Sequence, residues 1–290
     1  MALGTTSPSL VRRRIATRLG AVAVWTGGSG PDVVLWHGMF VSSSSWRDVV
    51  AELRTTRTVW VIDGPGFGAS DPLRRRTSIA ECAEVAVEIL DGLGLHEPVD
   101  WVGNAWGGHV GMQLAATTER IARLVAVSAP VRPSARRMAL RFMNLVMRVL
   151  GPTEAVLAVL LDLQLTAASR ELPERRAIVE SAVGSAQRRS LSLASASFVL
   201  DRKDATAQLG AITAPVLFVA SDDRVEWTPD DAAAAASMTV RGDWTVIPGA
   251  RTLIPVEQPH ALVEVLQEFW AATPAEPIHP TRRRVRSIRK

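Results

Sequence analysis

The chain has 290 residues, 47% of them hydrophobic, which suffices for one large α/β core with an insertion and is too little for two independent cores. Its formal charge of +4 arises from six cations within residues 282–290, so the remainder is slightly acidic and gives no reason to expect a specific nucleic-acid partner. No apolar run approaches the about 18 residues of a membrane span, and residues 1–10 lack an apolar signal core, so we expect a cytoplasmic protein without a membrane span.

Short runs rich in β-branched and aromatic residues alternate with helical patterns along the chain. A strand-like segment follows the arginines at 12–14, and several later runs are continuously apolar, as strands covered on both faces are. The predicted strands are 22–25, 33–37, 59–62, 99–102, 124–127, 216–220 and 245–247. Helices are predicted at 45–53, 78–93, 106–118, 229–236 and 257–270. This alternation predicts a mostly parallel α/β sheet with helices on both faces.

The pattern changes after Pro130. Residues 131–208 lose the strand signals and show helical segments at 138–150, 153–163 and 173–200. Their apolar residues would either line a lid over a site or pack against one another. We therefore predict three parts, which are a core of residues 1–130 and 209–272, a helical cap of residues 131–208, and a disordered basic tail at 273–290.

Five motifs follow one another along the chain, namely WHGM at 36–39, DGPGFGAS at 63–70, VGNAWGGHVG at 102–111, DDR at 222–224 and EQP at 257–259. In this order they resemble the α/β-hydrolase-fold superfamily over about residues 13–270. The third motif resembles the strand-to-helix elbow that carries the family's nucleophile. The resemblance implies an α/β-hydrolase fold, a mostly parallel and doubly covered sheet with a helical cap inserted between the sixth and seventh strands.

The catalytic triad that the resemblance implies is degenerate. Ala105 stands at the elbow, where the family carries a nucleophile, and Thr252 stands at the place of the histidine. Asp223 matches the acid position; it would pair with Arg251, act as a free acid or base, or lie exposed in its loop. An engineered replacement would explain Ala105 but not Thr252, so we favour a natural sequence.

An oxyanion hole does not depend on the missing side chains, because it consists of backbone N–H groups. By resemblance these belong to Met39 and Trp106, and the helix that begins after the elbow favours negative charge at its N-terminus. Such a hole polarises a carbonyl or holds an enolate. The candidates for contact with substrate are His37, Asn104, Trp106 and Glu226, although His37 is usually structural in this turn and Glu226 has a plain reading as an exposed loop acid.

Two further histidines are candidates for a substitute base. His109 lies one helical turn after Ala105 and is expected to pack against the sheet, whereas His260 lies eight residues after Thr252 and is a candidate displaced base. No pair of histidines has metal-ligand spacing and no dinucleotide fingerprint occurs, so we expect neither a metal nor a cofactor. The single cysteine, Cys82, excludes an internal disulfide and is expected to be buried.

Three functions are compatible with this sequence. The favoured one is a cofactor-independent enzyme of secondary metabolism that carries out non-hydrolytic chemistry, such as cyclisation, elimination or a lyase-type reaction, on a small apolar carbonyl compound. The second is an inactive protein that binds a ligand or a partner in the old pocket. The third is a weak hydrolase of esters in which Asp223 or His260 activates water. The sequence leaves the substrate and the oligomeric state open.

Overall fold

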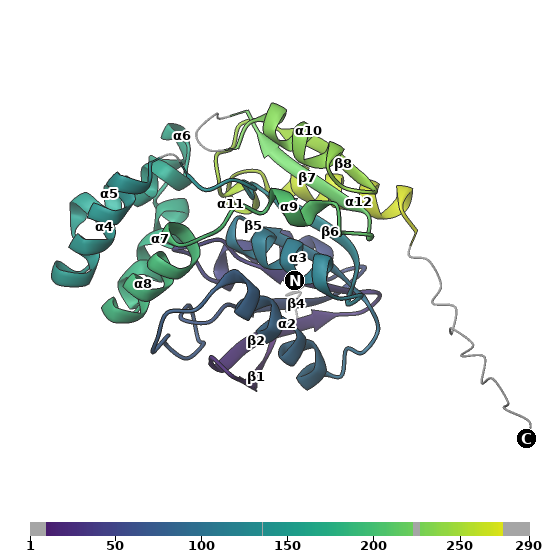
Figure 1. Cartoon of the computed structure of the whole chain (residues 1–290), viewed down its shortest axis with the longest axis horizontal. Coiled ribbons are helices and arrows are strands. Elements are labelled where there is room, and N and C mark those ends of the chain that lie inside the picture. The colour runs from purple at the N-terminus through teal and green to yellow at the C-terminus, as the bar shows by residue number, and fades with distance from the viewer. Residues whose placement is uncertain (1–9, 135, 223–226, 275–290) are drawn as a thin grey trace, which may run out of the picture.

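The computed structural model describes residues 10–134, 136–222 and 227–274. Its centre is an eight-stranded sheet in the order β1-β2-β4-β3-β5-β6-β7-β8 (Figure 1). The pairs β1–β2 and β2–β4 are antiparallel. All other neighbouring pairs are parallel. The prediction of a mostly parallel sheet is therefore confirmed.

The central strands are buried on both faces, as their continuous apolar sequences predict. The strands are β1 (Val11–Thr17), β2 (Gly20–Gly28), β3 (Asp32–Trp36), β4 (Thr58–Asp63), β5 (Val99–Asn104), β6 (Ile121–Val127), β7 (Val216–Ser221) and β8 (Gly242–Ile247). The arginines at 12–14 lie within β1, an exposed edge strand. Charged side chains suit that position because they discourage pairing with another sheet.

Helices cover both faces of the sheet and bury two apolar layers. One layer includes α2 (Ile79–Leu93), α3 (Trp106–Thr117) and α10 (Pro229–Ser237). The other includes α1 (Arg47–Leu53), which follows the 3-10 turn η1 (Ser43–Trp46), and α12 (Pro259–Ala272), which follows the short α11 (Ile254–Glu257). The buried Cys82 belongs to α2, as predicted.

A group of helices is inserted between β6 and β7; α4 to α8 lie to one side of the sheet, whereas α9 returns to the core beside α3 (Figure 1). It comprises α4 (Arg137–Leu150), α5 (Glu154–Gln164), α6 (Ala167–Arg170), α7 (Pro173–Ser185), α8 (Arg188–Ser195), the π-helical turn η2 (Ala196–Leu200) and α9 (Thr206–Leu209). We call the group the cap. The helix expected at 173–200 is instead interrupted, because Ala186 and Gln187 adopt extended backbone conformations. The insertion is confirmed, whereas the domain limits at 131 and 208 stay a prediction.

Hydrogen bonds hold the cap against the core at several points. The Glu257 carboxylate accepts from the Thr166 N–H at 2.8 Å and from the Thr166 hydroxyl at 2.7 Å. The Ser190 hydroxyl accepts from the Leu73 N–H at 2.9 Å. Because these contacts join residues far apart in sequence, they set where the cap sits over the end of the sheet.

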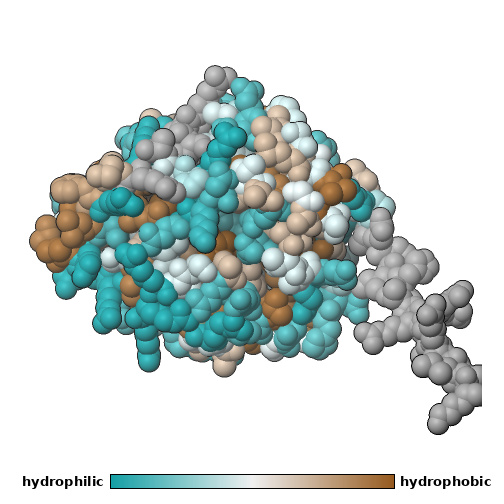
Figure 2. Space-filling model, in the orientation of Figure 1, coloured by the Kyte–Doolittle hydropathy of each residue, from teal (hydrophilic) through white to brown (hydrophobic). Residues whose placement is uncertain are grey.

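The outer face of α4 is apolar and exposed. A brown patch marks this end of the cap in Figure 2. The exposed side chains are Met138, Phe142, Leu145 and Val149, which recur at helical spacing. The opposite face of α4, with Leu140, Met143 and Met147, packs inward. Among the described residues, no helix is both long and apolar enough to cross a membrane.

A buried ion cluster lies near the amino end of β5. Asp100 accepts two hydrogen bonds from Arg123, both at 2.6 Å, and one from Arg57 at 2.6 Å. Arg123 also donates to the carbonyl oxygens of Trp270 and Thr273, at 3.0 and 2.8 Å. The cluster therefore joins the central strands to the end of α12.

Candidate active site

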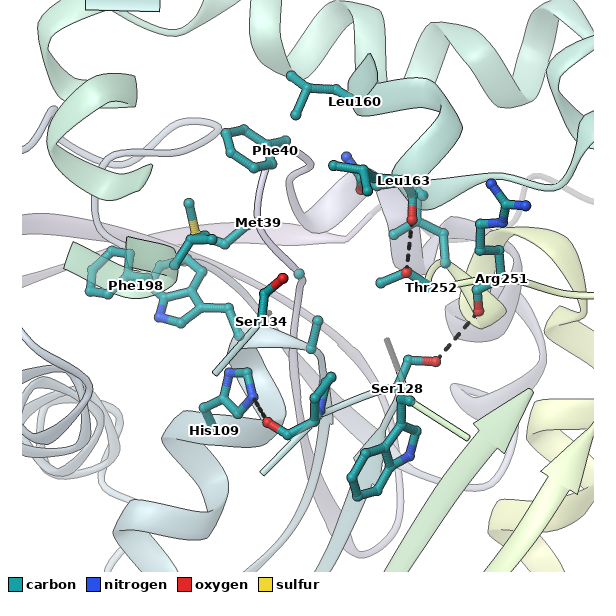
Figure 3. Close-up of a pocket in the computed structure, with 18 of the residues that line it drawn as sticks. Met39, Phe40, His109, Ser128, Ser134, Leu160, Leu163, Phe198, Arg251 and Thr252 are labelled. Atoms are coloured by element: carbon teal, nitrogen blue, oxygen red, sulfur yellow. Dashed lines mark hydrogen bonds between the residues drawn. The ribbon is translucent and has the colours of Figure 1, made fainter. Parts of the chain in front are cut away.

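A cavity of about 130 Å³ lies beneath the cap, at the carboxyl ends of the parallel strands. Its walls come from the loops after β3, β5, β6 and β7, from the loop at 251–253, and from cap elements including α4, α5 and η2 (Figure 3). Most of the lining is apolar, with Met39, Phe40, Leu140, Leu160, Leu163 and Phe198 among the residues. The described part of the chain thus has an open pocket at the place where an enzyme of this predicted fold would bind its substrate.

Ala105 forms the elbow between β5 and α3 and lines the cavity. Its backbone has φ 45° and ψ −102°, in a region that residues other than glycine rarely occupy. The glycines on each side are needed for close packing, since a Cβ on Gly103 would lie 2.1 Å from the backbone of Gly107, and one on Gly107 would lie 2.1 Å from the Trp36 oxygen. The turn therefore has a strained backbone and close strand-to-helix packing, with the small side chain of alanine at its tip.

The two predicted oxyanion-hole residues, Met39 and Trp106, both line this cavity. Neither backbone N–H donates a hydrogen bond within the part of the chain that the structure describes. Trp106 is the first residue of α3, where an N–H has no partner inside its own helix. The arrangement leaves two backbone donors beside Ala105, at a helix N-terminus that favours negative charge.

Thr252 lies beside the elbow, at the cavity wall. Its hydroxyl donates to the Leu163 oxygen in the cap at 3.0 Å, as Figure 3 shows. Its carbonyl oxygen accepts from the Asn104 side-chain amide at 2.8 Å. The Asn104 amide also donates to the Val127 oxygen at 3.2 Å. These hydrogen bonds from Asn104 therefore hold the loop that contains Thr252 against the elbow.

The predicted acid Asp223 and the candidate Glu226 lie outside the described residues, so their roles stay predictions. The neighbouring Asp222 accepts from the Gly249 N–H at 2.9 Å, which joins the loop after β7 to the loop after β8. Arg251, the suggested partner of Asp223, reaches the backbone oxygen and the carboxylate of Asp162 in the cap. Arg251 therefore helps to hold the cap in place.

His37 is fully buried under the site. Its Nε2 accepts from the Gly64 N–H at 2.9 Å, and its Nδ1 donates to the Gly38 oxygen at 2.6 Å. Burial lowers the pKa of His37, although the charge of Asp63 opposes this shift. With both ring nitrogens engaged, His37 supports the turn that carries Met39, and its predicted contact with substrate is not favoured by this geometry.

His109 was expected to pack against the sheet, but it lines the cavity. The side chain lies on α3, one turn after Ala105, and the residue is only 7% exposed. Its Nε2 lies 2.9 Å from the Pro130 oxygen and donates to it, whereas Nδ1 is buried and has no partner in the described chain (Figure 3). Burial, aided by the charge of Arg202, lowers the pKa of His109 well below its usual range. The ring is therefore neutral and offers an unused acceptor.

The cavity wall also contains polar residues that the sequence did not predict. Ser128 directly follows β6 and has a positive φ of 47°, and Ser221 ends β7. Gln164 ends α5, and both polar atoms of its buried amide lack partners in the described chain. Their positions at or just after the carboxyl end of a parallel strand could have indicated the two serines. Nothing in the sequence pattern distinguished Gln164.

The candidate base His260 is not among the residues that line the cavity. Its ring is exposed and contacts two surface carboxylates, Glu52 at 3.0 Å and Glu264 at 3.4 Å. The proposal that it replaces the missing histidine is therefore wrong, because α12 carries it to the surface. No group of three histidine, cysteine or acidic side chains suited to a metal ion occurs among the residues that the structure describes.

A capped cavity at a strained strand-to-helix elbow is the arrangement of hydrolase-type scaffolds. Residues 33–265 match the family model described as the alpha/beta hydrolase family. The chain belongs to this family, and its fold is the α/β-hydrolase fold with a helical insertion.

Similar solved structures include a thermophilic esterase from Thermogutta terrifontis, which has a TM-score of 0.83 and 24% identity and covers 91% of this chain and 99% of that one. The enol-lactonase from Burkholderia xenovorans LB400 has a TM-score of 0.82 and 18% identity, over 89% of this chain and 100% of that one. At such identities these likenesses show the fold alone.

A curated relative is more similar over a shorter stretch. The pimeloyl-[acyl-carrier protein] methyl ester esterase of Vibrio vulnificus is 34% identical over 106 residues, which are 36% of this chain and 38% of that protein. The chain thus spans little more than a third of the length of this relative. Its activity is therefore not transferred by the likeness.

Proposed function

We propose that the protein hydrolyses a small, largely apolar ester or lactone, with water as the nucleophile in place of a side chain. The observation that carries this proposal is the pair of backbone donors, Met39 N–H and Trp106 N–H, beside an alanine in a cavity lined mainly by apolar groups. Donors of this kind stabilise the charge that develops on a carbonyl oxygen under attack. The small side chain of Ala105 leaves room for water where other members carry a nucleophile.

The similar proteins support the same class of substrate. The Thermogutta and Vibrio proteins are described as esterases and the Burkholderia protein as a lactonase, so all three names refer to the cleavage of ester bonds. A cavity of about 130 Å³ suits a compact acyl or lactone group. The missing nucleophile predicts slow turnover, because water must be activated without a covalent intermediate.

A second candidate is non-hydrolytic chemistry at the same carbonyl site, such as cyclisation or elimination. Ala105 and Thr252 favour it, because a site that no longer performs acyl transfer has no use for the Ser-His pair. The two donors would then hold an enolate or polarise a ketone. The candidates differ in whether water becomes part of the product.

The test is to incubate the protein with a panel of short esters and lactones in ¹⁸O-labelled water and to follow mass by mass spectrometry. Hydrolysis adds one labelled oxygen to the acid product and supports the proposal. A changed compound whose products carry no labelled oxygen favours the second candidate, and a bound but unchanged compound favours a ligand-binding protein; either result overturns the hydrolase.

Two matched variants assign any activity to the cavity. Leu163→Trp should fill the cavity and abolish turnover. Leu172→Trp makes the same change at a partly exposed position before α7 and should leave turnover intact. Equal activity in both variants would place the reaction elsewhere.

A further inference from the structure

The outer face of α4 concentrates apolar side chains that are open to solvent. Met138, Leu150 and Phe142 are the three most exposed large apolar residues in the described part of the chain, at 75%, 68% and 70%. All three belong to α4, which also exposes Leu145 and Val149. An exposed apolar patch of this kind on a protein surface marks a contact with something less polar than water.

The patch has the shape of a stripe along the helix. Met138, Phe142, Leu145 and Val149 recur four, three and four residues apart, which keeps them on one side of α4. At 1.5 Å per residue the stripe is about 16 Å long. The helix has 14 residues, fewer than the about 20 that cross a bilayer, and it lies at the outer edge of the molecule (Figures 1 and 2). It therefore suits a position along a surface, not across one.

Arginines border the stripe, and no acid lies near them in the sequence. Residues 131–153 contain five arginines and no aspartate or glutamate. Arg141 and Arg148 each lie one helical turn from members of the stripe, are exposed, and form no ion pair with a residue that the structure describes. Arg188 on α8 donates to the Val149 oxygen at 3.0 Å, which adds a cation at the carboxyl end of the stripe. The face is therefore apolar and positively charged together.

We propose that the cap docks on a lipid surface that carries negative charge, with α4 lying along it. The apolar stripe enters the boundary between headgroups and acyl chains, and the arginines contact the anionic headgroups. A second copy of the chain fits less well, because it presents the same arginines and α4 has no acid to pair with them. Without lipid, this face should cause only weak association.

The inner face of α4 connects the docking surface to the cavity. Leu140 lines the cavity, and Met143 and Met147 belong to the apolar core. A bilayer bound by α4 therefore lies one helix away from the cavity. Docking requires no reaction, so its test is independent of the proposed hydrolysis.

The first experiment is flotation of the full-length protein with vesicles of equimolar phosphatidylglycerol and phosphatidylcholine. The protein should bind these vesicles, and binding should weaken as NaCl is raised or when phosphatidylcholine is the only lipid. A wild-type protein that stays unbound to the anionic vesicles overturns the proposal. A stable dimer in sedimentation that fails to bind vesicles would assign the face to a second copy instead.

A matched pair of valines tests the stripe. Val149→Ser should lower the partition coefficient on anionic vesicles about tenfold, because it removes an apolar side chain from the contact. Val240→Ser makes the same change at a position of similar exposure in the turn before β8 and should have no effect. Equal binding by the two variants would place the contact elsewhere and contradict docking through α4.

A matched pair of double variants tests the charges. Arg141→Gln with Arg148→Gln should lower the partition coefficient about 25-fold, because each arginine near an anionic surface contributes about 1 kcal/mol. Arg12→Gln with Arg13→Gln removes the same charge from exposed positions on β1 and should leave binding almost unchanged. The basic segment at 282–290 is the same in both. An equal loss in both would show attraction by net charge alone, against the proposal.

A fluorescent label reports the contact directly. The single cysteine, Cys82, is buried, so Leu145→Cys and Val240→Cys each introduce one accessible thiol for an environment-sensitive dye. On anionic vesicles the emission from position 145 should shift to the blue and be quenched by brominated acyl chains. The emission from position 240 should remain that of a dye in water. A dye at position 145 that stays in water while the protein is bound would refute docking through α4.

Discussion

Placing a serine and a histidine at the positions that the resemblance assigns to the nucleophile and its base should raise esterase activity. In the double variant Ala105→Ser with Thr252→His, the new hydroxyl would lie at the elbow. The new imidazole would lie on the neighbouring loop, which Asn104 holds against the elbow. The backbone at 252 is already held there by the 2.8 Å hydrogen bond from the Asn104 amide. A side chain at 105 meets no new backbone strain, since Ala105 already has the φ of 45° that the elbow requires.

The expected gain and cost follow from these contacts. A correctly placed general base contributes about 10²- to 10⁴-fold to the rate, so the double variant should exceed the wild-type kcat/KM by at least about 10²-fold. Loss of the hydrogen bond from the Thr252 hydroxyl to Leu163 should cost about 1 kcal/mol of stability. Ala105→Ser alone should gain little, because a serine without an adjacent base is a weak nucleophile.

The assay is hydrolysis of a short p-nitrophenyl ester, with burst kinetics to detect an acyl-enzyme. A burst in the double variant and none in the wild-type protein would support retained hydrolytic geometry. A folded double variant with wild-type rates would refute the reasoning, because it would show that the loop and the elbow no longer face each other productively.

Three further predictions concern stability and solubility. Asp100→Ala should lower the free energy of unfolding by about 3 to 5 kcal/mol in urea titrations, because it leaves Arg123 buried without its carboxylate; a loss below about 1 kcal/mol would contradict this. His260 has a pKa raised chiefly by its hydrogen bond to Glu52, so its stabilising contribution is present below the pKa of the unfolded chain and disappears as the pH rises through the folded pKa. Urea midpoints of His260→Gln and wild type should therefore differ at about pH 5 and converge by about pH 8. Phe142→Ser should change stability by less than about 0.5 kcal/mol while reducing concentration-dependent association in sedimentation.

The sequence predicted the sheet well because its signals are local. Continuous apolar runs such as those in β5 and β7 indicate strands covered on both faces, and glycines such as Gly103 mark a turn that excludes a Cβ. The break at Ala186 within the cap was missed, since nothing but two extended backbone conformations separates α7 from α8.

The site was predicted less completely, because a cavity depends on elements that are distant in sequence. His109 lines the cavity together with Phe198 and Arg202 from the inserted segment, a neighbourhood that no pattern within α3 reveals. Gln164 reaches the wall from the end of α5, and Ser128 from the end of β6. Position 252 lies beside the elbow because the Asn104 amide donates to the Thr252 oxygen, and its role in catalysis stays a prediction.

At Ala105, the strained backbone makes the direction of the backbone donors independent of the side chain at the elbow, two properties that are usually lost together. Strain of this kind costs on the order of 1 to 3 kcal/mol, and it is met by the packing of the surrounding strand and helix, not by the side chain that projects from the turn. The direction of the backbone donors is therefore independent of what occupies position 105. A scaffold built in this way can exchange its reactive side chains without refolding, so new reactions can arise on it through few substitutions while its anion-binding corner is inherited unchanged.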